Sequence, residues 1–161
     1  GYTAARALEH PHLGSLVVIE AFGAVIEWHR KELVPVSPAI ARDPRCRMLC
    51  ADFFALAADP KTGFDHDHLG RRFDAVLLDI DHSPQALLVD GTREFYSSEG
   101  LKTLQKHLKP GGVFALWSDD PPDAAFEANL RTTFTQTHSH VVSFDNPYTR
   151  EISTNTVYVA S

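Results

Sequence analysis

The chain has 161 residues and a net charge of −6, with 43% hydrophobic and 22% charged residues. These values are typical of one soluble globular domain with a substantial core. The negative charge argues against general nucleic-acid binders and acidic-membrane binders, because both depend on basic patches. No apolar run approaches the roughly 20 residues of a membrane span, no signal peptide is evident and only two cysteines occur, so we expect a cytoplasmic protein.

The first half of the chain is dominated by an apolar run that ends in a carboxylate. Leu16-Val17-Val18-Ile19 shows no polar alternation, which is typical of a parallel strand covered on both faces, and Glu20 closes the run. Thr3 is a possible cap of a helix that starts directly after Gly1. The elements expected here are helix 1–8, strand 15–20, helix 22–33, an irregular proline-containing connection, strand 45–50 and helix 53–58.

The second half of the chain continues the alternation of helices and strands and ends in two strands with alternating polar and apolar residues. Phe73 to Asp79 is another buried strand that ends in an acid. The elements expected after a polar loop at 59–72 are strand 73–79, loop 80–84, helix 97–108, a turn at 109–112, strand 113–117, helix 123–134 and alternating strands 135–144 and 154–160. This order predicts one α/β domain over 1–161, Rossmann-like, with a mostly parallel twisted sheet and a C-terminal antiparallel hairpin.

The start of the chain is unusual for this architecture. A strand and a glycine-rich turn normally precede the helix that begins after Gly1. We therefore expect the chain to be a fragment whose first strand and glycine loop lie upstream of Gly1.

Three strands in succession end in carboxylates: Glu20, Asp52 and Asp79. An isolated acid at a strand end is usually a solvated loop residue or a helix cap. Three acids at the same structural position should gather along one edge of the sheet, where ligands of doubly wound folds bind. The spacing suits an adenine nucleoside, with Glu20 at the ribose hydroxyls, Asp52 at the adenine amino group and Asp79 facing the reacting centre.

Several segments follow the motif order of a known superfamily. They are Gly-Tyr-Thr-Ala at 1–4, Val-Val-Ile-Glu at 17–20, Asp-Pro-Arg-Cys-Arg-Met-Leu-Cys-Ala-Asp at 43–52, Phe-Asp-Ala-Val-Leu-Leu-Asp at 73–79 and Leu-Lys-Pro-Gly-Gly-Val-Phe-Ala-Leu-Trp-Ser at 108–118. With these motifs the chain resembles the class I S-adenosylmethionine-dependent methyltransferases. Within them it is most similar to the spermidine synthase (polyamine aminopropyltransferase) group.

The resemblance implies a transferase that binds S-adenosylmethionine or its decarboxylated form and moves an alkyl group to a nucleophilic acceptor. Asp79 is the expected catalytic base, since an amine nucleophile must lose a proton. A homodimer is also implied, because aminopropyltransferases commonly form dimers. The implied site comprises Gly1, Glu20, Ala21, Asp52, Phe53 and Asp79 for the nucleoside, and Asp81, His82 and Trp117 for the substrate.

The loop after Asp79 departs from the family pattern. Spermidine synthases usually carry a second aspartate there for the amine substrate, whereas this chain has His82, and Trp117 ends a strand that lacks the usual glutamine. A polyamine needs carboxylates to replace its water. Two alternatives therefore stay open: a plain methyltransferase of unknown acceptor, and a non-catalytic binding or dimerisation module.

The remaining candidates favour structural interpretations. The stretch Asp65-His66-Asp67-His68 has metal-ligand residue types, but consecutive placement in a polar loop is typical of a solvated segment, so no metal site is predicted. Cys46 and Cys50 face the same side of one strand and are too far apart along it for easy pairing. Core packing is the expected role of both cysteines.

Overall fold

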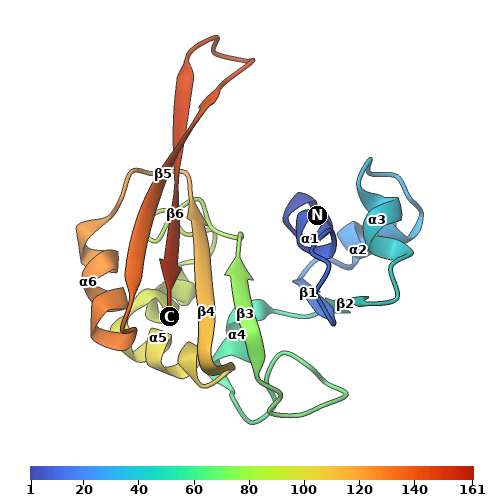
Figure 1. Ribbon diagram of the computed structural model, residues 1–161, viewed down its shortest axis with the longest axis horizontal. Coiled ribbons are helices and arrows are strands. Elements are labelled where there is room, and N and C mark those ends of the chain that lie inside the picture. The colour runs from blue at the N-terminus through green and yellow to red at the C-terminus, as the bar shows by residue number, and fades with distance from the viewer.

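The computed structural model describes residues 1–161, except for the side chain of Asp90. The predicted alternation of helices and strands is present along the whole chain (Figure 1). In chain order the elements are α1 (Tyr2–Leu8), β1 (Leu16–Glu20), α2 (Gly23–Arg30), α3 (Ser37–Ala41), β2 (Cys46–Cys50), α4 (Phe53–Ala58), β3 (Phe73–Leu78), the 3-10 helix η1 (Asp90–Tyr96), α5 (Ser98–Gln105), β4 (Leu108–Ser118), α6 (Ala124–Thr133), β5 (Thr137–Asp145) and β6 (Ile152–Ala160).

The strands form two sheets rather than one. β1 and β2 make a parallel pair, and the second sheet has the order β3-β4-β6-β5, in which β3 and β4 are parallel and β6 is antiparallel to both of its neighbours. The blue and cyan elements of the first sheet stand beside the larger sheet in Figure 1. The α/β class, the parallel strands and the C-terminal antiparallel hairpin are confirmed.

The core lies on one face of the larger sheet. In the register of β3, β4 and β6, side chains at every second position point to the same face, and those of this face are buried. Helices α4, α5 and α6 pack on it through residues of the same core cluster. The sheet residues involved are Val76, Leu78, Phe114, Leu116, Tyr158 and Ala160.

Side chains on the opposite face of the sheet are more exposed than the uninterrupted apolar sequence of these strands predicts. Leu77, between two buried neighbours in β3, is 49% exposed. Every residue of β1 is only half-buried. Contrary to the sequence prediction, neither strand is fully buried on both faces: α4, α5 and α6 cover one face of the larger sheet, which leaves Leu77 exposed, and the residues of β1 in the smaller sheet are half-buried.

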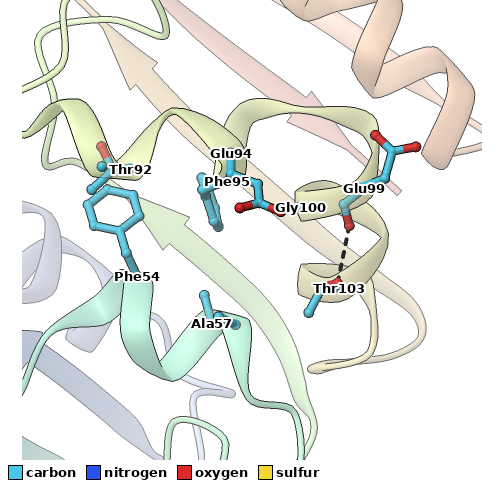
Figure 2. Close-up of a pocket in the computed structure, with 10 residues that line it drawn as sticks. Phe54, Ala57, Thr92, Glu94, Phe95, Glu99, Gly100 and Thr103 are labelled. Atoms are coloured by element: carbon cyan, nitrogen blue, oxygen red, sulfur yellow. Dashed lines mark hydrogen bonds between the residues drawn. The ribbon is translucent and has the colours of Figure 1, made fainter.

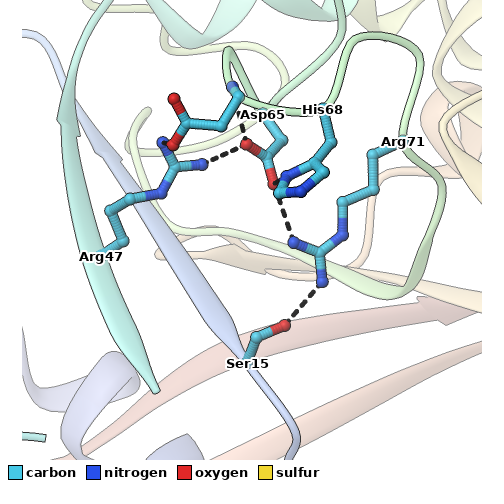
Figure 3. A network of polar contacts seen from close by, with 6 residues as sticks. Ser15, Arg47, Asp65, His68 and Arg71 are labelled. Carbon is cyan, nitrogen blue, oxygen red and sulfur yellow. Dashed lines mark hydrogen bonds and ion pairs between the residues drawn. The ribbon is translucent and has the colours of Figure 1, made fainter. Parts of the chain in front are cut away.

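An ion network joins the smaller sheet to the loop at 59–72 (Figure 3). The Asp65 carboxylate is 1% exposed and accepts hydrogen bonds from Arg47 of β2, from Arg71 at 2.8 Å and from a ring nitrogen of His68 at 3.2 Å. Arg71 also donates to Ser15 Oγ, just before β1, at 2.7 Å. Burial acts to raise the pKa of Asp65, but these hydrogen bonds and the Arg47 charge hold it well below its usual range. The expectation of a wholly solvated segment at 65–68 is wrong, because Asp65 is the centre of this network.

Several elements and boundaries differ from the sequence prediction; the helix expected over 22–33, for example, ends at Arg30. The irregular connection contains the short helix α3, which tolerates Pro38 because the first turn of a helix needs no amide donor. The predicted helix to Leu108 ends at Gln105, and the predicted turn at 109–112 lies inside β4. The β3–β4 register shifts between Phe73 and Ala75, so the residues of the predicted turn form a bulge in β4. This bulge includes Gly111 at φ 75°.

Two smaller expectations also fail. Gly1, not Thr3, is the N-cap of α1, and no side chain caps this helix. Cys50 is exposed and Cys46 is half-buried, and both are free thiols, so core packing does not describe Cys50.

The β5–β6 hairpin projects beyond the rest of the molecule (Figure 1). Several of its apolar side chains are exposed, among them Val141, Val142, Phe144 and Ile152. Such a ribbon contributes little to the core at its tip. None of the helices in the described part of the chain has the length and apolarity needed to cross a lipid bilayer.

Candidate functional site

Three carboxylates follow the carboxyl ends of parallel strands, as the sequence predicts. Glu20 is the last residue of β1 and lies opposite Cys50, the last residue of β2. Asp52 follows β2, and Asp79 follows β3 directly. Because β1 and β2 run in the same direction, Glu20 and Asp52 lie at one edge of their sheet.

Glu20 is held by the turn into α2. Its Oε1 accepts the Phe22 N–H at 2.8 Å. Ala21, between these two residues, is exposed. Gly1 and Glu20 line the same small hollow, whose wall includes the His29 ring. A β-carbon on Gly1 would come within 2.6 Å of that ring, so this position accepts only glycine without a shift.

His29 forms the buried side of this hollow. Its Nδ1 lies 3.0 Å from Ser37 Oγ. Burial lowers the pKa of His29, and the Glu20 carboxylate opposes this effect. The ring therefore stays neutral below the pH at which a solvated histidine would protonate.

Asp52 is the N-cap of α4. Its Oδ1 accepts the backbone N–H of Phe54 at 2.8 Å and of Ala55 at 3.3 Å. Phe53 is 8% exposed and stacks on Phe64 with ring centroids 5.2 Å apart. The Phe53 ring thus belongs to the core, and only its backbone is available to a ligand beside Asp52.

Asp79 contacts a residue from the start of the chain. Its Oδ2 accepts a hydrogen bond from the Thr3 hydroxyl in α1 at 3.0 Å. The Asp79 side chain is otherwise exposed. This bond joins the first helix to the residue that follows β3.

Each of the three carboxylates uses only one oxygen for the protein. The engaged oxygens are Glu20 Oε1, Asp52 Oδ1 and Asp79 Oδ2. In the part of the chain that the structure describes, the second oxygen of each group accepts no protein hydrogen bond. A nucleoside presents hydroxyl and amino donors, so this set of acceptors fits such a ligand.

The substrate-side residues are arranged less simply. His82 is exposed, and its carbonyl accepts the Asp119 N–H at 2.7 Å, which joins the loops after β3 and β4. Trp117 is half-buried on the sheet face opposite the core and is paired with Val157 in the register. Asp81, in contrast to His82, is not accessible to solvent, because it is 4% exposed and its carboxylate is bonded to groups inside the protein.

One further carboxylate at this edge escaped the sequence analysis. Asp119 follows β4, is exposed, and its Oδ1 accepts a hydrogen bond from Asn155 Nδ2 at 2.8 Å. Applying the strand-end rule to the fourth strand would have found it, since Asp119 stands directly after the apolar run that ends in Ser118.

A separate cavity of about 270 Å³ lies between α4, η1 and α5 (Figure 2). Phe54 and Phe95 form apolar walls, and Glu94 and Glu99 stand at its edge. None of Glu20, Asp52 or Asp79 lines it. Among the described residues, no cluster of three or more histidine, cysteine, aspartate or glutamate side chains is arranged to hold a metal.

Comparison with known proteins identifies the family of the chain. Residues 1–158 match the spermine/spermidine synthase domain family. The chain is 31% identical over 151 residues to polyamine aminopropyltransferase 2 of Pseudomonas aeruginosa, covering 87% of this chain and 38% of that relative.

Solved structures show the same fold. A spermidine synthase bound to the transition-state analogue AdoDATO superposes with a TM-score of 0.67 at 20% identity, over 99% of this chain and 48% of that chain. Spermidine synthase from Thermotoga maritima gives a TM-score of 0.65 at 21% identity, over 96% and 47% of the two chains. The chain thus spans half or less of the length of these relatives. The family match over nearly its whole length shows that the chain belongs to the spermine/spermidine synthase family.

Proposed function

We propose that this chain provides the nucleoside-binding part of a spermidine synthase-like transferase that uses decarboxylated S-adenosylmethionine and an amine acceptor. The single observation that carries the proposal is the set of three strand-end carboxylates, each with one oxygen left for a ligand. Family membership and the aminopropyltransferase relative support the same class of reaction.

In this proposal the three carboxylates have different tasks. Glu20 accepts hydrogen bonds from the ribose hydroxyls and Asp52 accepts from the adenine amino group, beside Gly1, Ala21 and the backbone of Phe53. Asp79 accepts the proton that the acceptor nitrogen loses, and its bond to Thr3 fixes the carboxylate for that transfer. His82 and Trp117 line the acceptor side.

The cosubstrate supplies the electrophilic carbon and the leaving group. The acceptor nitrogen forms a bond to the carbon next to the sulfonium sulfur while the carbon–sulfur bond breaks and its electron pair stays on sulfur. The protein positions the nucleophile in line and removes its proton.

A specific observation keeps a methyltransferase as the second candidate. The family's second amine-binding aspartate is replaced by exposed His82, and the neighbouring Asp81 is buried. Fewer accessible carboxylates weaken the case for a polycationic acceptor. A homodimer, a cytoplasmic location and the absence of nucleic-acid partners are further proposals, the last supported by the net charge of −6.

Thermal unfolding of the full-length protein with S-adenosylmethionine and its decarboxylated form, side by side, tests the proposal. Ligand at about 100 times its dissociation constant should add about 2.7 kcal/mol to the free energy of unfolding. Preference for the decarboxylated form supports aminopropyl transfer, and preference for the intact form supports methyl transfer. Stabilisation by neither would leave the non-catalytic module.

A further inference from the structure

Asp81 is a buried carboxylate that forms no salt bridge with any cationic side chain among the described residues. It is 4% exposed, and its two oxygens are used inside the protein. Oδ1 accepts the Leu88 N–H at 2.8 Å, and Oδ2 accepts the Tyr96 hydroxyl at 2.5 Å. A buried charge is costly unless its hydrogen bonds are complete, so the surrounding structure must hold these donors firmly.

Tyr96 is a rigid donor. Its side chain is 5% exposed and its ring meets Phe126 with centroids 5.8 Å apart. The Tyr96 carbonyl accepts Asn129 Nδ2 of α6 at 3.0 Å. Burial raises the pKa of Tyr96 and the hydrogen bond to Asp81 raises it further, so the hydroxyl keeps its proton.

The segment between these contacts is the loop that follows Asp79. Asp81 closes the loop at its start, where it binds Leu88 across seven positions. Within the loop, the buried Ser83 hydroxyl accepts the Gln85 and Ala86 N–H groups at 3.2 and 3.0 Å. The loop is also tied to its neighbours by the His82 carbonyl, which accepts the Asp119 N–H, and by Gln85 Nε2, which donates to Asp123 at 3.1 Å. Asp81 is the residue that fixes the loop backbone at Leu88 to the buried Tyr96.

We propose that Asp81 is a positioning residue: through Tyr96 and the Leu88 amide it fixes the loop that presents Asp79 and His82 to the acceptor, and it does not itself contact the acceptor. This inference rests on the proposed function. It replaces the sequence-based role of Asp81 as a substrate ligand, because a carboxylate with both oxygens bonded in the interior offers none to an amine.

Substitutions at Asp81 separate the two roles. In Asp81→Asn the amide oxygen can accept from Leu88 and the amide nitrogen can donate to the Tyr96 oxygen, so geometry is kept and charge is removed. Asp81→Ala and Tyr96→Phe break the contacts. Tyr158→Phe is the matched control, since Tyr158 is also buried and its hydroxyl accepts a backbone N–H, from Asp123, at 2.7 Å.

Steady-state kinetics of the full-length enzyme measure the acceptor KM, and titration measures the cosubstrate Kd. We expect Asp81→Asn and Tyr158→Phe to keep the acceptor KM within about twofold, and Asp81→Ala and Tyr96→Phe to raise it about tenfold with the cosubstrate Kd unchanged. If Asp81→Asn is as damaging as Asp81→Ala while Tyr96→Phe is neutral, the carboxylate binds the acceptor directly and the inference is wrong.

Hydrogen exchange at the Leu88 amide gives a readout that does not depend on activity. Exchange should become faster in Asp81→Ala and Tyr96→Phe but not in Asp81→Asn or Tyr158→Phe. Unchanged exchange in Asp81→Ala refutes the positioning role even if transfer is observed. A wild-type protein that binds neither cosubstrate and transfers nothing refutes the proposed function, while the exchange pattern still decides whether Asp81 fixes the loop.

Discussion

Among single residues, Glu20 uses one of its two carboxylate oxygens within the protein. Oε1 holds the Phe22 N–H, and the proposed ribose contact falls to Oε2. Glu20→Ala should therefore weaken nucleoside affinity by about 1–3 kcal/mol, the scale of a lost hydrogen bond to a charged group. Calorimetric titration with the preferred cosubstrate measures the loss, and Glu151→Ala, an exposed glutamate in the hairpin turn, is the control. An unchanged affinity in Glu20→Ala would contradict the assignment of Glu20 to the ribose.

Asp52 combines a structural role with a proposed ligand contact, and two substitutions separate them. Asp52→Asn keeps an oxygen that accepts the Phe54 and Ala55 N–H groups, so the free energy of unfolding should not change. Its amide nitrogen is a donor and would face the adenine amino group, which is also a donor, so nucleoside binding should weaken. Asp52→Ala should lose binding and also about 1 kcal/mol of stability, the usual cost of a removed helix cap. Urea denaturation and ligand titration measure the two effects; wild-type binding by Asp52→Asn would contradict the adenine contact.

His107 should make stability depend on pH. It is 1% exposed, and its Nε2 lies 2.9 Å from the Ala57 carbonyl. Burial lowers its pKa, against smaller opposite effects of the Ala57 carbonyl and Asp59. The unfolded chain then binds a proton at a higher pH than the folded one, so stability is lost as pH falls below about 6.5, by at most about 1.4 kcal/mol per pH unit for one group.

Urea denaturation across this pH range checks the dependence. His107→Gln should show a shallower loss of stability with falling pH than the wild type, and His29, whose pKa is also lowered, accounts for part of what remains. His138→Gln is the control, since His138 is exposed. The same slope in His107→Gln and wild type would remove His107 from the explanation.

The sequence predicts strand-end residues well and side-chain direction in loops poorly. Glu20 and Asp79 could be found because an apolar run that ends in an acid fixes their position at the sheet edge. The sequence assigned Asp81 to the substrate, but the direction of its side chain depends on Tyr96, 15 residues away, in a 3-10 helix that the apolar pattern does not predict. The burial of the Phe53 ring likewise depends on Phe64, in the irregular loop that follows α4.

At the scale of elements, type was more predictable than extent. The helices at α4 and α6 and the strands β3 and β5 fall within a few residues of their predicted ranges, because their apolar periodicity is local. The start of β4 was wrong, because Lys109 to Gly112 has turn chemistry, whereas pairing with β3 decides its conformation. The strand propensity of these residues carries no information about the strand with which they pair.

The ion network around Asp65 should contribute strongly to stability. Removing a buried carboxylate leaves Arg47 and Arg71 facing each other without their anion, and breaking a buried pair costs roughly 3–5 kcal/mol. Because each arginine is more than a third exposed and water reaches it, Asp65→Ala should fall at the lower end of that range. Asp74→Ala, which removes the exposed pair with Lys109, is the control and should cost far less. Equal loss in both variants, measured by urea denaturation, would contradict the argument.

At the scale of the whole molecule, the two sheets should differ in local stability. β4 pairs on both sides, with β3 and β6, whereas β1 and β2 each have a single partner. A two-stranded sheet is marginal by itself. In native-state hydrogen exchange of the 161-residue chain, we expect the β4 amides to exchange slowest and those of β1 and β2 to exchange faster. Uniform protection across both sheets would contradict this expectation.

The hydrogen bond from Thr3 to Asp79 joins the helix beside the proposed nucleoside pocket to the proposed base. Any ligand that shifts α1 therefore alters the environment of the acceptor's proton. Linkage makes this effect mutual: if the first ligand changes the affinity of the second by some factor, the second changes the affinity of the first by the same factor. If the two proposed ligands are coupled through Thr3, the affinity of each will therefore change by the same factor when the other is bound.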